Sequence, residues 1–175
     1  MLDRRAAIRL ALAALAAAWM ALSSPAGAQD FQKFVPFLVD LPGWTADEAH
    51  GTATWTPFGD NIMATRPYKR GSAKLSAEIV SGPLTQGFLF MRQKFMKDME
   101  NEIHGVRVRM SMSQVDGFTV LQTFVTNEPD SVCTITVALS SNAMFNLGSH
   151  GIPEDEAFGL ARRFDWKAIQ GALPK

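Results

Sequence analysis

The feature that most constrains the fold is a pair of alternating segments on either side of Asp116-Gly117. Apolar and polar residues alternate from Val106 to Ser113, as in a strand with one buried and one exposed face. The second segment runs from Phe118 to Thr126. A two-residue Asp-Gly loop favours a type I′ turn, because both of its positions need a positive φ. We therefore predict a hairpin in which Val115 lies opposite Phe118.

Other segments predict further strands joined by short turns. A second hairpin is expected around residues 69–72, because Gly71 lies between two runs of strand-forming residues. Strands are expected at 44–48, 62–68, 73–81, 132–140 and 143–149, with a loop at 50–60. Because hairpins dominate, we predict an α+β domain with a mostly antiparallel sheet of about six or seven strands.

Three helices are predicted to pack on this sheet. The longest is a central helix that opens at Gly82-Pro83 and ends at Gly105, where glycine tolerates a left-handed conformation. Its expected buried stripe consists of Leu84, Phe88, Met91, Phe95 and Met99, which recur at helical spacing. A short helix is expected at the N-terminus from Asp30, and a C-terminal helix after Pro153, where acidic residues complement the helix dipole.

Residues 1–28 have the organisation of a cleavable signal peptide. Arginines precede an apolar run, Leu10–Leu22, and Ala26-Gly27-Ala28 follows as a cleavage site. The apolar run is short for a membrane-spanning helix, although a retained anchor is the alternative. The residues after Arg4-Arg5 depart from the twin-arginine pattern, which favours the Sec route. We predict that residues 29–175 form one domain in the periplasm or outside the cell, with no membrane span after cleavage.

Charge and cysteine content restrict the possible partners and the chemistry. Without residues 1–28, the chain has fourteen basic and sixteen acidic residues, a net charge of −2. This balance argues against binding to nucleic acid or to an anionic membrane. Cys133 is the only cysteine, so an intramolecular disulfide is impossible. Its place in an alternating strand predicts a buried, inert thiol rather than a nucleophile.

No motif predicts a catalytic residue, a cofactor or a metal ion. The three histidines are each followed by glycine in predicted loops, and they lack the spacing of metal ligands. Met110 and Met112 share a strand face with valines, which predicts core packing rather than Cu(I) ligation. The alternative interpretation is a periplasmic copper-binding protein or an enzyme that uses His and Met ligands.

Large apolar side chains in the expected loop are the candidate binding site. Trp55, Pro57 and Phe58 lie in a segment that should be exposed, and Trp44 lies in a preceding turn. Together they would form an apolar patch or a pocket rim, unless the loop folds back as a lid on the core. The predicted function is therefore that of a non-enzymatic exported domain that binds a partner protein or a small apolar ligand.

Short motifs carry a resemblance to known proteins. Leu41-Pro42-Gly43-Trp44, the strand-turn-strand around Gly71 and Phe164-Asp165-Trp166 resemble those of a group of uncharacterised bacterial exported proteins. The resemblance covers nearly all of residues 29–175 and implies export, but no activity. In topology alone, the expected layout is also similar to that of the photosystem accessory family PsbP, which implies no function.

Overall fold

A computed structural model describes residues 30–173, apart from 96–97 and 128–129, so the predicted signal peptide lies outside the described residues. The strands are β1 (Thr45–Ala46), β2 (His50–Thr56), β3 (Gly59–Arg70), β4 (Ala73–Ser81), β5 (Met99–Ile103), β6 (Val106–Val115), β7 (Phe118–Asn127), β8 (Asp130–Ser140) and β9 (Ala143–His150). Two 3₁₀ helices, η1 (Asp30–Lys33) and η2 (Val35–Phe37), precede them. The α-helices are α2 (Pro83–Phe95), α3 (Glu154–Ala161) and α4 (Trp166–Gly171).

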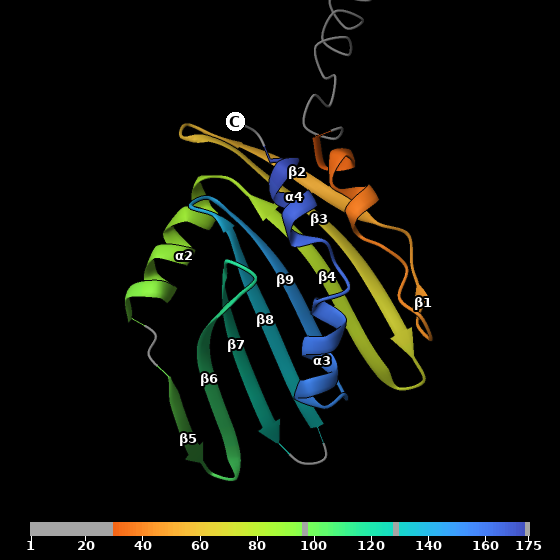
Figure 1. The fold of residues 1–175 in the computed structure, drawn as a ribbon, viewed down its shortest axis with the longest axis vertical. Helices are drawn as coiled ribbons and strands as arrows, with labels where there is room; N and C mark the ends of the chain where they lie inside the picture. Colours follow the sequence, from red (N-terminus) through yellow and green to blue (C-terminus); the bar gives the residue numbers. More distant parts are fainter. Residues whose placement is uncertain (1–29, 96–97, 128–129, 174–175) are drawn as a thin grey trace, which may run out of the picture.

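All the described strands belong to one antiparallel sheet. Its order is β1-β3-β4-β9-β8-β7-β6-β5, and β2 also pairs with β3, beyond β1 along the same edge (Figure 1). None of the helices in the described part of the chain has the length and apolar character needed to span a bilayer.

The hairpin between β6 and β7 has the predicted register. Val115 pairs with Phe118, and Met112 pairs with Leu121 three residues further from the turn. Asp116 and Gly117 have φ angles of 52° and 87°, as a type I′ turn requires. The prediction for this hairpin is confirmed.

The core lies on the sheet face that α3 and α4 cover, in front of β8 and β9 in Figure 1. Ile135 and Val137 of β8 and Phe145 of β9 are fully buried there. The ring of Phe164, in the connection between α3 and α4, lies 4.8 Å from that of Phe145. Asp165 caps the start of α4, because its Oδ1 accepts a hydrogen bond from the backbone N–H of Ala168 at 2.9 Å.

The predicted fold class is wrong. The described chain forms nine strands rather than six or seven, its helices are short, and it is mostly β rather than a sheet on a long central helix. The cause is the turn at His104-Gly105, whose φ angles of 53° and 79° are both positive. That pair forms a hairpin turn between β5 and β6 instead of ending a helix, so α2 ends at Phe95 and Met99 starts a strand.

The predicted stripe on α2 is also wrong. Leu84, Phe88 and Met91 are exposed, whereas Thr85 and Leu89 are the buried residues of the described part of the helix. The side chain of Phe95 lies outside the described residues. In the described part of the chain, the main contacts of α2 are with β3, β4 and β9, at one end of the sheet, so a narrow strip of its surface is covered.

The expected loop at 50–60 is a hairpin instead. Threonines alternate with other residues along β2, and β-branched residues favour an extended backbone. β2 pairs with β3 from His50 opposite Thr65 to Thr56 opposite Gly59, which leaves Pro57 and Phe58 as the turn. The expected N-terminal helix is the pair η1 and η2, because Pro36 has no N–H to continue a longer helix.

The sheet face opposite α3 and α4 is less completely covered. Met63, Met99, Met112 and Val132 lie on this face by register, and each is at least about a third exposed. The prediction that Met112 packs in the core is therefore wrong: its alternating strand turns apolar side chains to the face without α3 and α4. Cys133 points to the other face and is 1% exposed, which confirms its predicted burial.

β5 ends the sheet on one side. Its Glu100 and Glu102 lie on one face with Arg107 of β6, whose guanidinium is 3.8 Å and 3.5 Å from the two carboxylates.

Arg66 of β3 connects the sheet to the N-terminal segment. Its guanidinium donates hydrogen bonds to the carbonyl oxygens of Leu38 and Asp47 at 2.5 Å and 3.2 Å. It also forms an ion pair of 2.6 Å with the exposed carboxylate of Asp40. Tyr68, two residues further on, donates its hydroxyl to the carbonyl oxygen of Val39 at 2.8 Å. One strand therefore holds the N-terminal segment through several backbone carbonyls.

Candidate functional site

The hairpin of β2 and β3 carries the two most exposed aromatic side chains among the described residues. Trp55 is 76% exposed and Phe58 is 85% exposed. Within the turn, the Thr56 hydroxyl donates to the carbonyl oxygen of Gly59 at 2.6 Å and accepts from the N–H of Phe58 at 3.3 Å. These bonds fix the turn, so the two rings project from an ordered hairpin.

The tip of this hairpin extends past the neighbouring strand. β3 pairs with β4 only from Ile62 onward, so the residues before Ile62 lie beyond the last residue of β4 (Figure 1). Trp55 lies opposite Asp60 within this extension. The hairpin therefore presents Trp55 and Phe58 at a protruding end of the sheet.

The start of α2 is attached to this tip. The N–H of Leu84 donates to Oδ1 of Asn61 at 3.0 Å, and the N–H of Gly82 donates to the carbonyl oxygen of Asn142 at 2.8 Å. Gly82 has a φ of +132°, and a Cβ atom there would collide with the backbone of Asp60. Glycine at this position therefore permits the close approach of α2 to the hairpin.

α2, which begins beside the tip, also carries exposed apolar side chains. Leu84 is 72% exposed, Phe88 39% and Met91 56%, and their spacing of four and three residues places them along one side of the helix. Phe90 is also exposed on this helix. We call Trp55, Phe58, Leu84, Phe88 and Met91 the tip patch.

The structure separates the four residues that the sequence grouped as a site. Pro57 is exposed in the turn between Trp55 and Phe58. Trp44 is 8% exposed and lies against the guanidinium of Arg70, whose carbon is 4.5 Å from the ring centroid. Arg70 is the last residue of β3, whereas the tip lies at the start of β3, before its pairing with β4 begins at Ile62. Trp44 therefore lies at the opposite end of that strand. Trp44 is a core residue and does not belong to the tip patch.

A hollow of about 420 Å³ lies beside the tip. Phe58, Ile62 and Pro83 contribute apolar surface, and Lys33, Asp60 and Asn142 contribute polar groups. The tryptophan of the tip does not line it. Trp55 therefore does not close this hollow as a lid.

The sequence predicts too little of this site, because helical spacing places Leu84, Phe88 and Met91 in the core. The signal that marks them is the breadth of the apolar surface on α2: Leu89 and Phe90 are apolar as well, so the helix is apolar on more than one side. When only one strip of such a helix is covered, the apolar side chains outside that strip are exposed.

The chemistry available elsewhere is limited. Burial raises the pKa of the Cys133 thiol to about 11, so it stays protonated at neutral pH and is a poor nucleophile. His50 begins β2, His104 lies in the turn between β5 and β6, and His150 ends β9. In the described ranges, no group of three or more His, Cys, Asp or Glu side chains is arranged to hold a metal ion.

No family model, curated protein or solved structure matches this chain. The resemblance to uncharacterised exported proteins therefore stays a prediction.

Proposed function

We propose that this protein is a non-enzymatic binding module that docks onto a partner protein through the tip patch. We also propose that it acts outside the cytoplasm after removal of residues 1–28, as the composition of that segment predicts. The observation that carries the docking proposal is the exposure of Trp55 and Phe58, 76% and 85%, at the protruding end of the β2–β3 hairpin.

The tip patch differs from ordinary surface apolar residues because its members lie on adjoining elements. Single exposed apolar side chains are common, whereas a continuous exposed patch marks an interaction site. Tryptophan and other large aromatic side chains often dominate the binding energy of such interfaces. The hydrogen bond from the N–H of Leu84 to Oδ1 of Asn61 fixes the start of the helix against the hairpin that carries Trp55 and Phe58.

The shape and charge of the tip favour a protein partner over a small ligand or a membrane. Small-molecule sites are concave, whereas Trp55 and Phe58 project outward. Residues 51–65 contain a single charged residue, Asp60, so the hairpin offers no basic group to an anionic lipid surface. A partner with an apolar hollow that receives both rings fits these properties best.

Photo-crosslinking from the tip tests this proposal. Phe58 is replaced by a benzoyl-phenylalanine, and the protein is irradiated in its native compartment. Lys74, an exposed residue of β4 at the other end of the sheet, carries the same group in a control. We expect one discrete adduct from position 58 and none from position 74.

Competition shows whether the tip patch itself makes the contact. An excess of unlabelled protein should suppress the adduct, and the Trp55→Ser, Phe58→Ser variant should not. Because both side chains are exposed, this variant should unfold within about 0.5 kcal/mol of the parent protein. Equal competition by the two proteins, or the same adduct from position 74, would contradict the proposal.

A further inference from the structure

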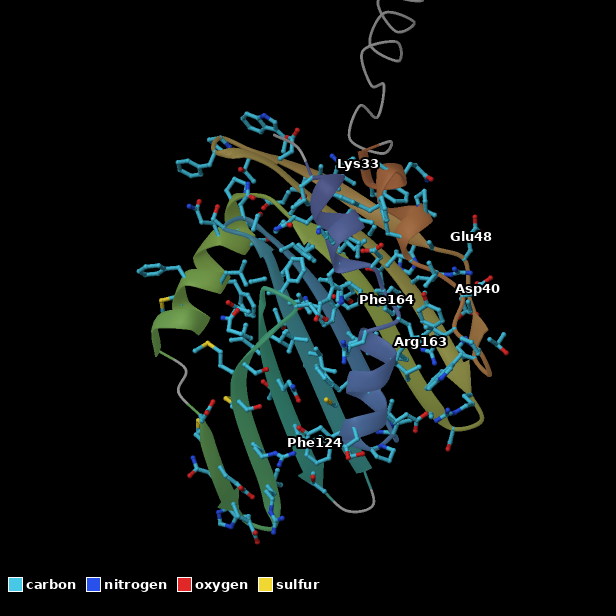
Figure 2. All side chains as sticks on the ribbon, in the orientation of Figure 1. Lys33, Asp40, Glu48, Phe124, Arg163 and Phe164 are labelled. Atoms are coloured by element: carbon cyan, nitrogen blue, oxygen red, sulfur yellow. The ribbon has the colours of Figure 1, made fainter. Side chains whose placement is uncertain are left out.

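A second surface feature lies far along the chain from the tip patch, in the connection between α3 and α4. A pocket of about 360 Å³ is formed by residues 162–167, which span this connection and the start of α4, together with Asp116 of the β6–β7 turn and Phe118 at the start of β7. Figure 2 shows Arg163 and Phe164 of the connection, which crosses in front of the sheet. The pocket shares no residue with the tip patch, and its volume lies within the range of small-molecule sites.

Aromatic rings form the rigid part of this pocket. Phe118, Phe164 and Trp166 are each less than 10% exposed, and the rings of Phe118 and Trp166 meet edge to face at 5.9 Å. Trp166 also carries a buried indole N–H that no described residue accepts. The backbone N–H of Trp166, by contrast, donates to the carbonyl oxygen of Phe164 at 3.0 Å, which holds the connection in a tight bend. The apolar wall is therefore fixed by the core beneath it.

Basic side chains surround this wall. Arg162, Arg163 and Lys167 line the pocket with two acids, Asp116 and Asp165, which gives it a net charge of +1. Both acids already have partners: Asp116 lies 3.2 Å from Arg162, and Asp165 accepts the N–H of Ala168.

The remaining two cations are available to a ligand. In the part of the chain that the structure describes, neither Arg163 nor Lys167 makes an ion pair or a side-chain hydrogen bond. Both are exposed, so they keep their hydration until an anion replaces it. A guanidinium and an ammonium group beside an apolar wall match an anion that is attached to a hydrophobic body.

We propose that this pocket binds a small amphipathic anion, whose carboxylate or similar group is held by Arg163 and Lys167 and whose apolar or aromatic body lies against the wall of Phe118 and Trp166. The pocket volume limits the body to roughly the size of one or two fused rings with a substituent. Binding here is independent of docking through the tip patch, because the two surfaces use different elements.

Two fluorescent probes that differ in charge test the proposal. Anilinonaphthalene sulfonate has an aromatic body and an anionic group, and N-phenylnaphthylamine has a similar body without the charge. The protein used is the Trp55→Ser, Phe58→Ser variant, so that probe binding at the tip patch does not contribute. We expect the sulfonate to bind with one-to-one stoichiometry and to bind more weakly in high salt.

Substitution of the two cations identifies the site. Arg163→Gln with Lys167→Gln should weaken sulfonate binding about fivefold to tenfold and leave the uncharged probe unaffected. Lys69→Gln with Lys74→Gln removes the same charge at the turn between β3 and β4 and should leave both probes unaffected. The proposal is overturned if the first pair leaves sulfonate binding unchanged, if both probes weaken together, or if the control pair has the same effect. Since all four side chains are exposed, folding is preserved in each variant.

Discussion

Replacement of Arg66 by methionine removes the guanidinium that attaches the N-terminal segment to β3 and keeps most of the aliphatic volume of the side chain. The lost interactions are hydrogen bonds to the carbonyl oxygens of Leu38 and Asp47 and the ion pair with Asp40. The two carbonyl oxygens then lose a charged donor in a partly buried region. The N-terminal segment, which covers one edge of the core, is consequently less firmly held.

The structure permits an estimate of the cost. A hydrogen bond to a charged group contributes about 1.5–3 kcal/mol, so the two bonds to carbonyl oxygens contribute about 3–6 kcal/mol together. Because these contacts are only partly buried, the lower half of that range applies. The carboxylate of Asp40 is 85% exposed, so its ion pair adds less than about 1 kcal/mol. We expect Arg66→Met to lower the free energy of unfolding by about 3–5 kcal/mol.

Urea unfolding followed by circular dichroism measures this change. With a typical dependence on urea, the midpoint should fall by about 2 M and the slope should stay unchanged. Asp40→Asn is the matched control, because it removes only the exposed ion pair and should cost less than about 1 kcal/mol. A loss below about 1 kcal/mol for Arg66→Met, or an equal loss for both variants, would refute the reasoning.

Three further predictions concern pH, backbone geometry and processing. Burial raises the pKa of Tyr68 to about 12 from 10.0 and that of Cys133 to about 11 from 9.0. Their neutral forms therefore stabilise the fold fully below about pH 9, and this stability is lost as the pH rises through 11 and 12. In the parent protein the midpoint of urea unfolding should fall as the pH rises above about 9, and this fall should be smaller in Tyr68→Phe and in Cys133→Ala. Gly82→Ala should cost at least about 1 kcal/mol in thermal unfolding, since it forces Cβ into the backbone of Asp60; an unchanged melting temperature would contradict the close approach. Chain recovered from the periplasm should begin at Gln29 by N-terminal sequencing, and recovery of an intact N-terminus would exclude cleavage after Ala28.

The sequence pattern predicted the fold well where a short segment was compatible with only one local structure. The Asp116-Gly117 turn specified the register of β6 and β7, because a two-residue type I′ turn places Val115 opposite Phe118. The pattern failed at His104-Gly105, since a glycine with positive φ suits both the end of a helix and a hairpin turn. Only the pairing of β5 with β6, which depends on the whole sheet, distinguishes the two.

The candidate site shows the same dependence on tertiary structure. Trp55 and Phe58 were identified from the sequence because large apolar residues are unusual in a turn region. Trp44 is also a large aromatic residue beside a predicted turn, yet it is buried in the core and the guanidinium of Arg70 lies over its ring. The stripe on α2 has ordinary amphipathic spacing, and its exposure follows from the small part of the sheet that this helix contacts.

Strand β5, the edge of the sheet that carries Glu100 and Glu102, also affects whether two molecules can associate through their sheets. An outermost strand has backbone groups that a strand of another molecule can pair with. If two β5 strands paired antiparallel about Asn101, Glu100 of each molecule would face Glu102 of the other. The two Arg107 side chains would then confront four carboxylates, so like-charge repulsion opposes continuation of the sheet from one molecule to the next. The charges on β5 thus oppose edge-to-edge association of a protein that is rich in strands. This protection matters most at the high local concentrations of a crowded compartment.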